Sequence, residues 1–197
     1  TFPHINGDRA TMEVLVNSFL TIGLDELSGG RPCFINFTEN LLHEPIFDSL
    51  DSKYIIIEIL ENVQITPLFV KQIRQLKNKG FRIALDDFVL TEQLLHAREI
   101  FSYIDFIKVD FIGSTVEERK KIELFFKANY PYIHLLAEKV ETRAEFEEAK
   151  QAGYHLFQGY FFSKPHIIQG QDIPTNLATY FRIIGLISEK QANVTQI

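Results

Sequence analysis

The sequence of 197 residues predicts an α/β fold of the TIM-type (β/α) barrel class. Short runs rich in β-branched and aromatic residues alternate along the chain with segments that carry helix signals. The runs are continuously apolar, which is typical of parallel strands buried on both faces. Polar side chains follow almost every run, as expected for a barrel whose ligand site lies at the carboxyl ends of its strands.

The expected strands are residues 33–37, 54–59, 82–85, 104–109, 133–137 and 155–157. About six strand and helix pairs in roughly 150 residues fit either a barrel or a doubly wound open sheet. The two folds differ in the place of the ligand site. It lies above all the strand ends in a barrel, but at one switch point in an open sheet.

Two of the helices between these strands have clear start signals. Thr66 can cap a helix that begins at Pro67, because proline is well tolerated in the first helical turn. Thr142 and Glu145 have the spacing of a capping box, and Gly153 suits the left-handed residue that ends that helix. Apolar residues at helical spacing predict further helices over residues 10–27 and 174–190.

Composition limits the classes of partner and compartment. Hydrophobic residues make up 46% of the chain, which is typical of a globular protein. The formal net charge is −6, so most of the surface should repel duplex nucleic acid. The 18 phenylalanines fall inside apolar segments, which favours core packing. No apolar run approaches the ~18 residues of a membrane span, so no membrane partner is expected. A single cysteine, Cys33, indicates a reducing compartment and a cytoplasmic protein.

The residues with chemical potential close the expected strands. Six of them should ring one pocket in a barrel: Asn36, Glu58, Asp86, Asp87, Glu138 and Gln158. Lys108 and Asp110 close the fourth strand. Several carboxylates so close repel one another unless cations intervene, and Mg²⁺ or Mn²⁺ suits such oxygen ligands. We expect an ion to prefer the anionic Glu58 and Asp86. Taken alone, an Asp-Asp pair is commonly part of a turn or a helix cap. A zinc site is disfavoured, because the histidines lack the spacing of zinc ligands.

The same residues lie in six ordered motifs that resemble those of EAL domains. The motifs occupy residues 34–38, 57–61, 83–88, 107–110, 137–142 and 157–165, and include Leu-Asp-Asp-Phe, Ala-Glu-Lys-Val-Glu-Thr and Phe-Gln-Gly-Tyr. EAL domains are bacterial TIM-barrel-like phosphodiesterases that cut cyclic di-GMP to the linear dinucleotide with Mg²⁺ or Mn²⁺. The start of the chain and its C-terminal part further resemble the branch in which an EAL domain precedes an HDOD domain.

The resemblance implies a role for each matching residue. Asn36, Glu58, Asp86 and Glu138 would bind metal, with Asp87 on a second metal or bridging. Lys108 would orient the attacking water and stabilise charge on the phosphate, and Glu138 is also the candidate base. Gln158 and Glu141 would support water or substrate, and Glu61 would anchor the loop after the paired aspartates.

Three departures from the family pattern bear on activity. The family's first strand, with the glutamate of the Glu-Ala-Leu motif, would precede Thr1. Residues 88–92 are Phe-Val-Leu-Thr-Glu where active members have Phe-Gly-x-Gly, so the loop has less backbone freedom. Lys139 stands where the family has glycine, and we expect it to compete with metal for Glu138.

The resulting domain prediction is an EAL-like barrel over residues 1–170, followed by residues 171–197 as a helix and connection to an HDOD-like domain. The ligand is cyclic di-GMP, and a homodimer is left open. The function is that of a weak or inactive metal-dependent phosphodiesterase. Alternatives are a catalytically degenerate cyclic di-GMP receptor, a protein-interaction scaffold, or an unrelated metal-dependent barrel enzyme.

Overall fold

The computed structural model describes residues 28–38, 42, 47, 50–92 and 98–162. The helices expected over residues 10–27 and 174–190 lie outside this range, as does the boundary expected at residue 170. The six expected strands and the interior helices lie inside it.

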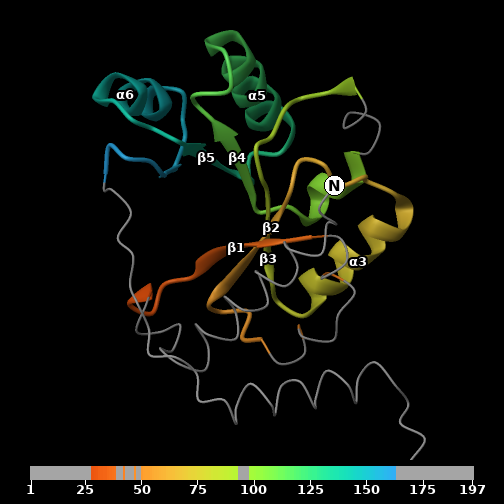
Figure 1. Ribbon diagram of the computed structural model, residues 1–197. Helices are drawn as coiled ribbons and strands as arrows, with labels where there is room; N and C mark the ends of the chain where they lie inside the picture. Colours follow the sequence, from red (N-terminus) through yellow and green to blue (C-terminus); the bar gives the residue numbers. More distant parts are fainter. Residues whose placement is uncertain (1–27, 39–41, 43–46, 48–49, 93–97, 163–197) are drawn as a thin grey trace, which may run out of the picture.

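Six parallel strands form one curved sheet in the order in which they occur along the chain (Figure 1). They are β1 (Cys33–Phe37), β2 (Ile55–Ile59), β3 (Arg82–Leu85), β4 (Phe106–Asp110), β5 (His134–Glu138) and β6 (Leu156–Phe157). Each strand pairs with the next one in sequence. A doubly wound sheet reverses its strand order at a switch point, and no reversal occurs among these six strands. The barrel alternative is therefore confirmed.

The helices follow the strands and cover the outer face of the sheet. They are α3 (Pro67–Asn78), the 3₁₀ helix η4 (Arg98–Tyr103), α5 (Val116–Asn129) and α6 (Arg143–Gln151). Both expected N-caps are confirmed. The Thr66 hydroxyl accepts a hydrogen bond from the Phe69 amide at 3.1 Å, and Thr142 forms the capping box with Glu145. Gly153 has a φ of +86°, as expected for the residue that ends α6.

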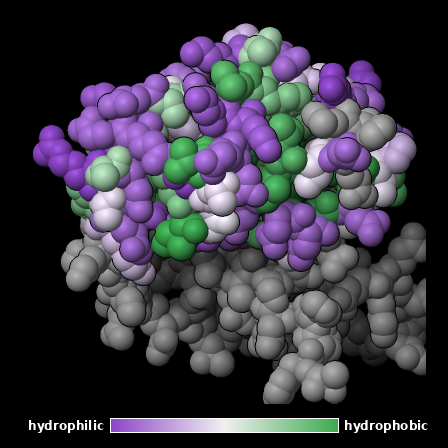
Figure 2. Space-filling view, turned by 90° about the horizontal axis from the view of Figure 1, so that it is seen from above, coloured by the Kyte–Doolittle hydropathy of each residue, from purple (hydrophilic) through white to green (hydrophobic). Residues whose placement is uncertain are grey.

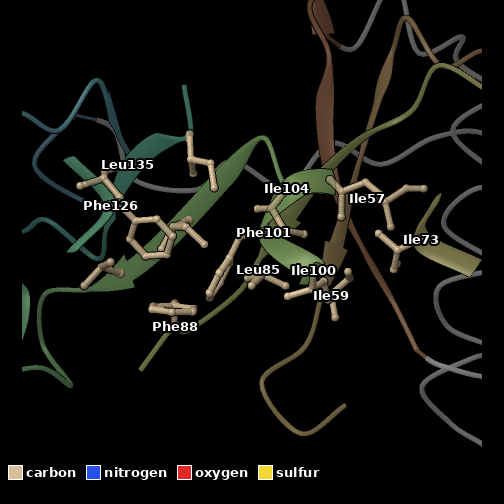
Figure 3. Packing of buried hydrophobic residues seen from close by; sticks show 14 of the residues in the cluster. Ile57, Ile59, Ile73, Leu85, Phe88, Ile100, Phe101, Ile104, Phe126 and Leu135 are labelled. Atoms are coloured by element: carbon tan, nitrogen blue, oxygen red, sulfur yellow. The ribbon is translucent and has the colours of Figure 1, made fainter. Parts of the chain in front are cut away.

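The main core lies between the outer face of the sheet and the helices. Because side chains alternate along a strand, Ile55, Ile57 and Ile59 of β2 all point to this side, where they are buried. Figure 3 shows such strand residues packed with the rings of Phe101 and Phe126. Those two rings meet edge to face with centroids 5.3 Å apart. Core packing thus accounts for much of the phenylalanine content.

The inner face of the sheet has a smaller apolar layer made of Phe34, Ile56, Ala84 and Phe106. These residues come from four successive strands, and the rings of Phe34 and Phe106 meet with centroids 5.4 Å apart. Two positions further along the same strands lie Asn36, Glu58, Asp86 and Lys108. The two-residue period of a strand therefore places these polar side chains on the inner face, one level nearer the carboxyl ends.

Candidate functional site

A carboxylate and lysine cluster occupies the inner face at the carboxyl ends of the strands. Glu58, Lys108 and Glu138 are the most enclosed members, with only 6%, 4% and 6% of their surfaces exposed. Asp86 follows β3 directly, and its amide donates to the Ile59 carbonyl at 2.9 Å, which continues the strand ladder. Asn36 and Gln158 lie at the ends of the two edge strands, where both are exposed. The predicted strand-end pattern thus brings Glu58, Asp86, Lys108 and Glu138 into one group.

Lys108 is the centre of this group. Its Nζ lies 2.6 Å from Asp86 Oδ1 and 2.7 Å from Glu138 Oε1, and it also pairs with Glu58. The same Nζ is 5.8 Å from the centroid of the Phe34 ring, in the apolar layer beneath. A buried ammonium is strongly unfavourable without partners, and three carboxylates from three other strands supply them. The cluster is therefore tied to the packing of the sheet.

Burial and the neighbouring charges shift the pKa values of these side chains in opposite directions. Burial raises the pKa of the Glu138 carboxyl to about 7, even though the Lys108 ammonium acts to lower it. Burial likewise raises the pKa of Glu58. Burial alone would lower the pKa of Lys108, but its hydrogen bonds to Asp86, Glu138 and Glu58 raise it above its ordinary range. Lys108 is therefore a fixed positive charge, whereas Glu138 exchanges a proton near neutral pH.

A second, more exposed group lies beside the first. Lys139 Nζ is 2.6 Å from Asp110 Oδ2 and 3.5 Å from Asp87 Oδ1. The bond to Lys139 and those from the amides of Gly113 and Ile112 outweigh burial and lower the pKa of Asp110. The prediction that Lys139 competes with a metal ion for Glu138 is wrong, because Lys139 contacts other carboxylates. Lys139 pairs with Asp87 and Asp110, whereas Lys108 pairs with Glu138.

Three carboxylates of the described chain offer ligand atoms close enough to hold a metal ion. Oxygens of Asp86, Asp87 and Glu138 all lie within 4.8 Å of one another. Such hard oxygen donors suit Mg²⁺, Mn²⁺ or Ca²⁺, so the residues present fit a divalent cation. Glu58, which we expect to be a preferred ligand, is not in this group of three, and its carboxylate pairs with the Lys108 ammonium. Asp87 and Glu138 accompany Asp86 instead.

A pocket of about 450 Å³ lies between the loop after β2 and the loop after β3. Glu61 lines it on one side, and Asp87, Val89 and Thr91 line it on the other. Asp87 has a φ of +40°, whereas Val89 is not among the described residues with positive φ. The amide of Phe88 donates to the Lys108 carbonyl at 2.9 Å, which ties the start of the loop to β4. Glu61 thus lines the same pocket as the loop for which the resemblance makes it the anchor.

The segment after β5 is held closely against the segment after β6. A Cβ added to Gly159 would lie 2.1 Å from the Val140 carbonyl oxygen, so only glycine fits there without a shift. Around this contact the Val140 amide donates to Gln158 and the Phe161 amide donates to Val140. The exposed Glu141 follows, and its amide donates to the Glu145 carboxylate at 2.8 Å. These contacts fix the backbone beside Glu138 and Lys139.

Sequence reasoning missed two residues of the site, Asp110 and Gly159. Asp110 closes the expected fourth strand, but it is not among the six residues expected around the pocket. It lies two positions after Lys108 and is therefore on the same face of β4. That alternation could have identified it. The contact of Gly159 with Val140 joins segments from different strands, and nothing in the local sequence specifies it.

A barrel with carboxylates and a lysine at its strand ends defines a candidate site for metal-assisted chemistry. The family model described as the EAL domain matches residues 8–165 of the sequence, and the chain therefore belongs to the EAL domain family. It is 41% identical over 196 residues to the protein YuxH of Bacillus subtilis (strain 168), covering 98% of this chain and 47% of that protein. It is 34% identical over 169 residues to the cyclic di-GMP phosphodiesterase CdgJ of Vibrio cholerae, covering 85% and 38%. The chain therefore spans less than half the length of these two relatives.

Solved EAL structures share the fold. A standalone versatile EAL protein from Vibrio cholerae O395, in its cyclic di-GMP-bound form, matches with a TM-score of 0.63 and 24% identity over 84% of this chain and 77% of that one. Bacillus subtilis YkuI, in complex with cyclic di-GMP and calcium, matches with a TM-score of 0.61 and 20% identity over 92% and 49%. Within the part of the chain described, no helix is both long and apolar enough to cross a membrane.

Proposed function

We propose that this chain is a cyclic di-GMP signalling domain whose acidic cluster is the site of a metal-dependent phosphodiesterase with weak or absent turnover. The observation that carries the proposal is the buried Lys108 ammonium held by Glu58, Asp86 and Glu138 at the carboxyl ends of parallel strands. Membership of the EAL family supports the reaction class, and a relative named as a cyclic di-GMP phosphodiesterase supports the substrate.

In this proposal the chain's own residues bind the phosphodiester and move a proton. Lys108 supplies a fixed positive charge where negative charge develops on the phosphate. Glu138 accepts a proton from the attacking water, since a pKa of about 7 suits a general base at neutral pH. Gln158 and Glu141 orient water or substrate from the exposed rim.

The metal ligands in this proposal are Asn36, Glu58, Asp86, Asp87 and Glu138. The metal is Mg²⁺ or Mn²⁺, both of which prefer oxygen donors of this kind. When bound, a divalent ion supplies Lewis-acid stabilisation and lowers the pKa of a coordinated water. For Glu58 to reach such an ion, its carboxylate must turn away from Lys108, with which it pairs here.

The loop of residues 88–92 is the reason for proposing weak turnover. Val89 is 57% exposed and lines the pocket opposite Glu61. β-Branched valine has less backbone freedom than glycine, so closing the loop over the cluster is less favourable. Misplacement of reacting groups by about 1 Å can lower a rate on the order of 10²-fold. Glu61 is present to receive the loop, so the defect lies in the loop and not in its anchor.

The second candidate is a receptor, for which the pocket would bind the nucleotide without cutting it. The same loop sequence favours it. The complete protein, incubated with cyclic di-GMP and Mg²⁺ or Mn²⁺, separates the two by chromatography of products and by calorimetry. Slow hydrolysis with binding is expected. Binding without product supports the receptor, and neither binding nor product contradicts both and leaves the scaffold.

A matched variant tests the loop itself. We expect Val89→Gly with Thr91→Gly to raise kcat by about tenfold or more and to change Kd little, because loop closure affects placement more than contact. Lys108→Met in the glycine-restored protein should abolish the gain. A fast parent enzyme, or no gain despite intact metal binding, would show that the loop does not limit the reaction.

The wider organisation belongs to the same proposal. In this proposal the barrel domain covers residues 1–170, and residues 171–197 connect it to an HDOD-like domain in a cytoplasmic protein, whose assembly as a monomer or homodimer is left open. Light scattering of the complete protein and limited proteolysis near residue 170 test the assembly and the boundary.

A further inference from the structure

Lys139 has a backbone conformation that lysine rarely adopts. Its φ is +54°, in the left-handed region, and among the described residues only Asp87 shares a positive φ without being glycine. Close contact of Cβ with the backbone makes this conformation unfavourable for most residues other than glycine. Such strain persists only where the surrounding structure holds it.

The surrounding structure does hold the backbone on both sides of Lys139. The Glu138 carbonyl accepts from the Phe111 amide at 3.0 Å, and the Val140 amide donates to the Gln158 carbonyl at 3.0 Å. Val140 is also pressed against Gly159. The conformation is therefore fixed by the segments after β4 and β6, and it directs the ammonium toward Asp87 and Asp110.

Asp87 belongs to two groups at once. Its carboxylate is one of the three that can surround a metal ion, with Asp86 and Glu138. It is also one of the two that face the Lys139 ammonium, with Asp110. An ordinary surface lysine pairs with whatever carboxylate is near and contributes little. Here the lysine takes a ligand from the acidic cluster.

The Lys139 ammonium and a divalent ion cannot both occupy the space between Asp87 and Asp110, because two cations in contact there would repel each other strongly. A divalent ion held mainly by Asp86 and Glu138 can coexist with Lys139. A second divalent ion between Asp87 and Asp110 cannot, since the ammonium already lies 2.6 Å from Asp110 Oδ2.

We propose that the Lys139 ammonium is a built-in cation that occupies the Asp87 and Asp110 side of the cluster, so that this chain takes one divalent ion where the acidic residues could hold two. Removing the charge opens the second position. The inference rests on the proposed function in treating the acidic cluster as a cation site, but it concerns occupancy and does not require turnover.

The test is Mn²⁺ binding to the complete protein at low salt, followed by the electron paramagnetic resonance signal of free Mn²⁺. We expect one ion per chain for the wild type. Lys139→Met, which removes the charge and keeps the backbone demand, should bind a second ion, with an apparent Kd at least about tenfold lower than any second binding by the wild type. Lys139→Arg should behave as the wild type, and adding Asp110→Asn to Lys139→Met should remove the second ion.

Lys139→Gly separates charge from conformation, since it removes the charge and also relieves the left-handed strain. It should bind Mn²⁺ as Lys139→Met does. Equal stoichiometry and affinity in the wild type and Lys139→Met, with unchanged circular dichroism, would overturn the inference, as would two ions on the wild type.

The failure of the proposed function gives a different result. A wild type that binds no Mn²⁺ contradicts the metal-dependent function. One ion on Lys139→Met in that case still supports the role of Lys139, and none on either protein overturns both proposals.

Discussion

Lys108 and Lys139 both lie at the carboxyl ends of strands and both pair with carboxylates, yet they differ in almost every physical respect. The Lys108 side chain is 4% exposed and has three carboxylate partners, whereas that of Lys139 is 49% exposed and has two. Lys108 follows the alternation of β4, while Lys139 depends on a left-handed turn after β5. The comparison shows that one positive charge is part of the folded core, whereas the other lies at the solvent-exposed edge of the cluster.

The largest expected effect comes from removing the buried charge. Lys108→Met leaves the buried Glu58 and Glu138 and the half-buried Asp86 without this cation, and breaking a buried pair in this way costs about 3 to 5 kcal/mol. The free energy of unfolding of the metal-free protein, measured by urea denaturation at pH 7, should fall by that amount. Adding Glu58→Gln should recover part of the loss, because one uncompensated charge is gone. A change in Lys108→Met below about 1 kcal/mol would remove the distinction between the two lysines.

The next effect is a dependence of stability on pH through Glu138. Its pKa is raised from 4.5 to about 7 in the folded chain, so the folded state binds the proton more tightly than the unfolded state does. This contribution is fully present below about pH 4.5 and is lost as pH rises through 7. Metal-free protein should lose on the order of 2 kcal/mol between pH 5 and pH 8, since one pKa unit corresponds to about 1.4 kcal/mol.

The control for the pH effect is Glu138→Gln, which keeps the shape and cannot titrate. Urea midpoints at a series of pH values should show a shallower slope for the variant than for the wild type. Equal slopes would mean that Glu138 is ionised throughout and that Lys108 dominates its protonation.

Much of this arrangement could be predicted from the sequence, and the reason is strand periodicity. The continuous apolar runs determined the strands to within two residues, and the two-residue period placed Glu58, Lys108 and Glu138 on one face. Local side-chain chemistry likewise determined the caps at Thr66 and Thr142. These features depend on residues that are close in sequence, so the sequence carries them directly.

The partners of Lys139 and the role of Gly159 could not be predicted in the same way. Lys139 meets Asp110, which lies 29 positions away, and its direction depends on a backbone angle that only the tertiary structure fixes. The Gly159 contact joins the segments after β5 and β6. The surface pattern does not indicate these contacts either. On the face seen in Figure 2 hydrophilic residues predominate, and hydrophobic ones lie in small groups between them.

A smaller effect should follow from filling the space at Gly159. The Cβ of alanine would lie 2.1 Å from the Val140 carbonyl oxygen, which is backbone and cannot move aside cheaply. We expect Gly159→Ala to lower the free energy of unfolding by about 2 kcal/mol, as steric conflicts in packed regions do. Gly153→Ala is the matched control. Gly153 also has a positive φ, but a Cβ there meets nothing within 4 Å, so its loss should be near 1 kcal/mol. Equal losses would show that the segment bearing Lys139 is not held by this contact.

The smallest effect concerns the stability of the Lys139 turn, and it sharpens the comparison with Lys108. The ion pairs of Lys139 are exposed, so losing them in Lys139→Met should change the free energy of unfolding by no more than about 1 kcal/mol. Lys139→Gly loses the same ion pairs but relieves a φ of +54°, which is worth roughly 1 kcal/mol for a residue other than glycine. The glycine variant should therefore be more stable than the methionine variant by about that amount in metal-free urea denaturation. Because both variants lack the ammonium, their difference isolates the conformational strain. A glycine variant no more stable than the methionine variant would mean that the turn accommodates lysine without strain, and that only the charge of Lys139 sets this residue apart.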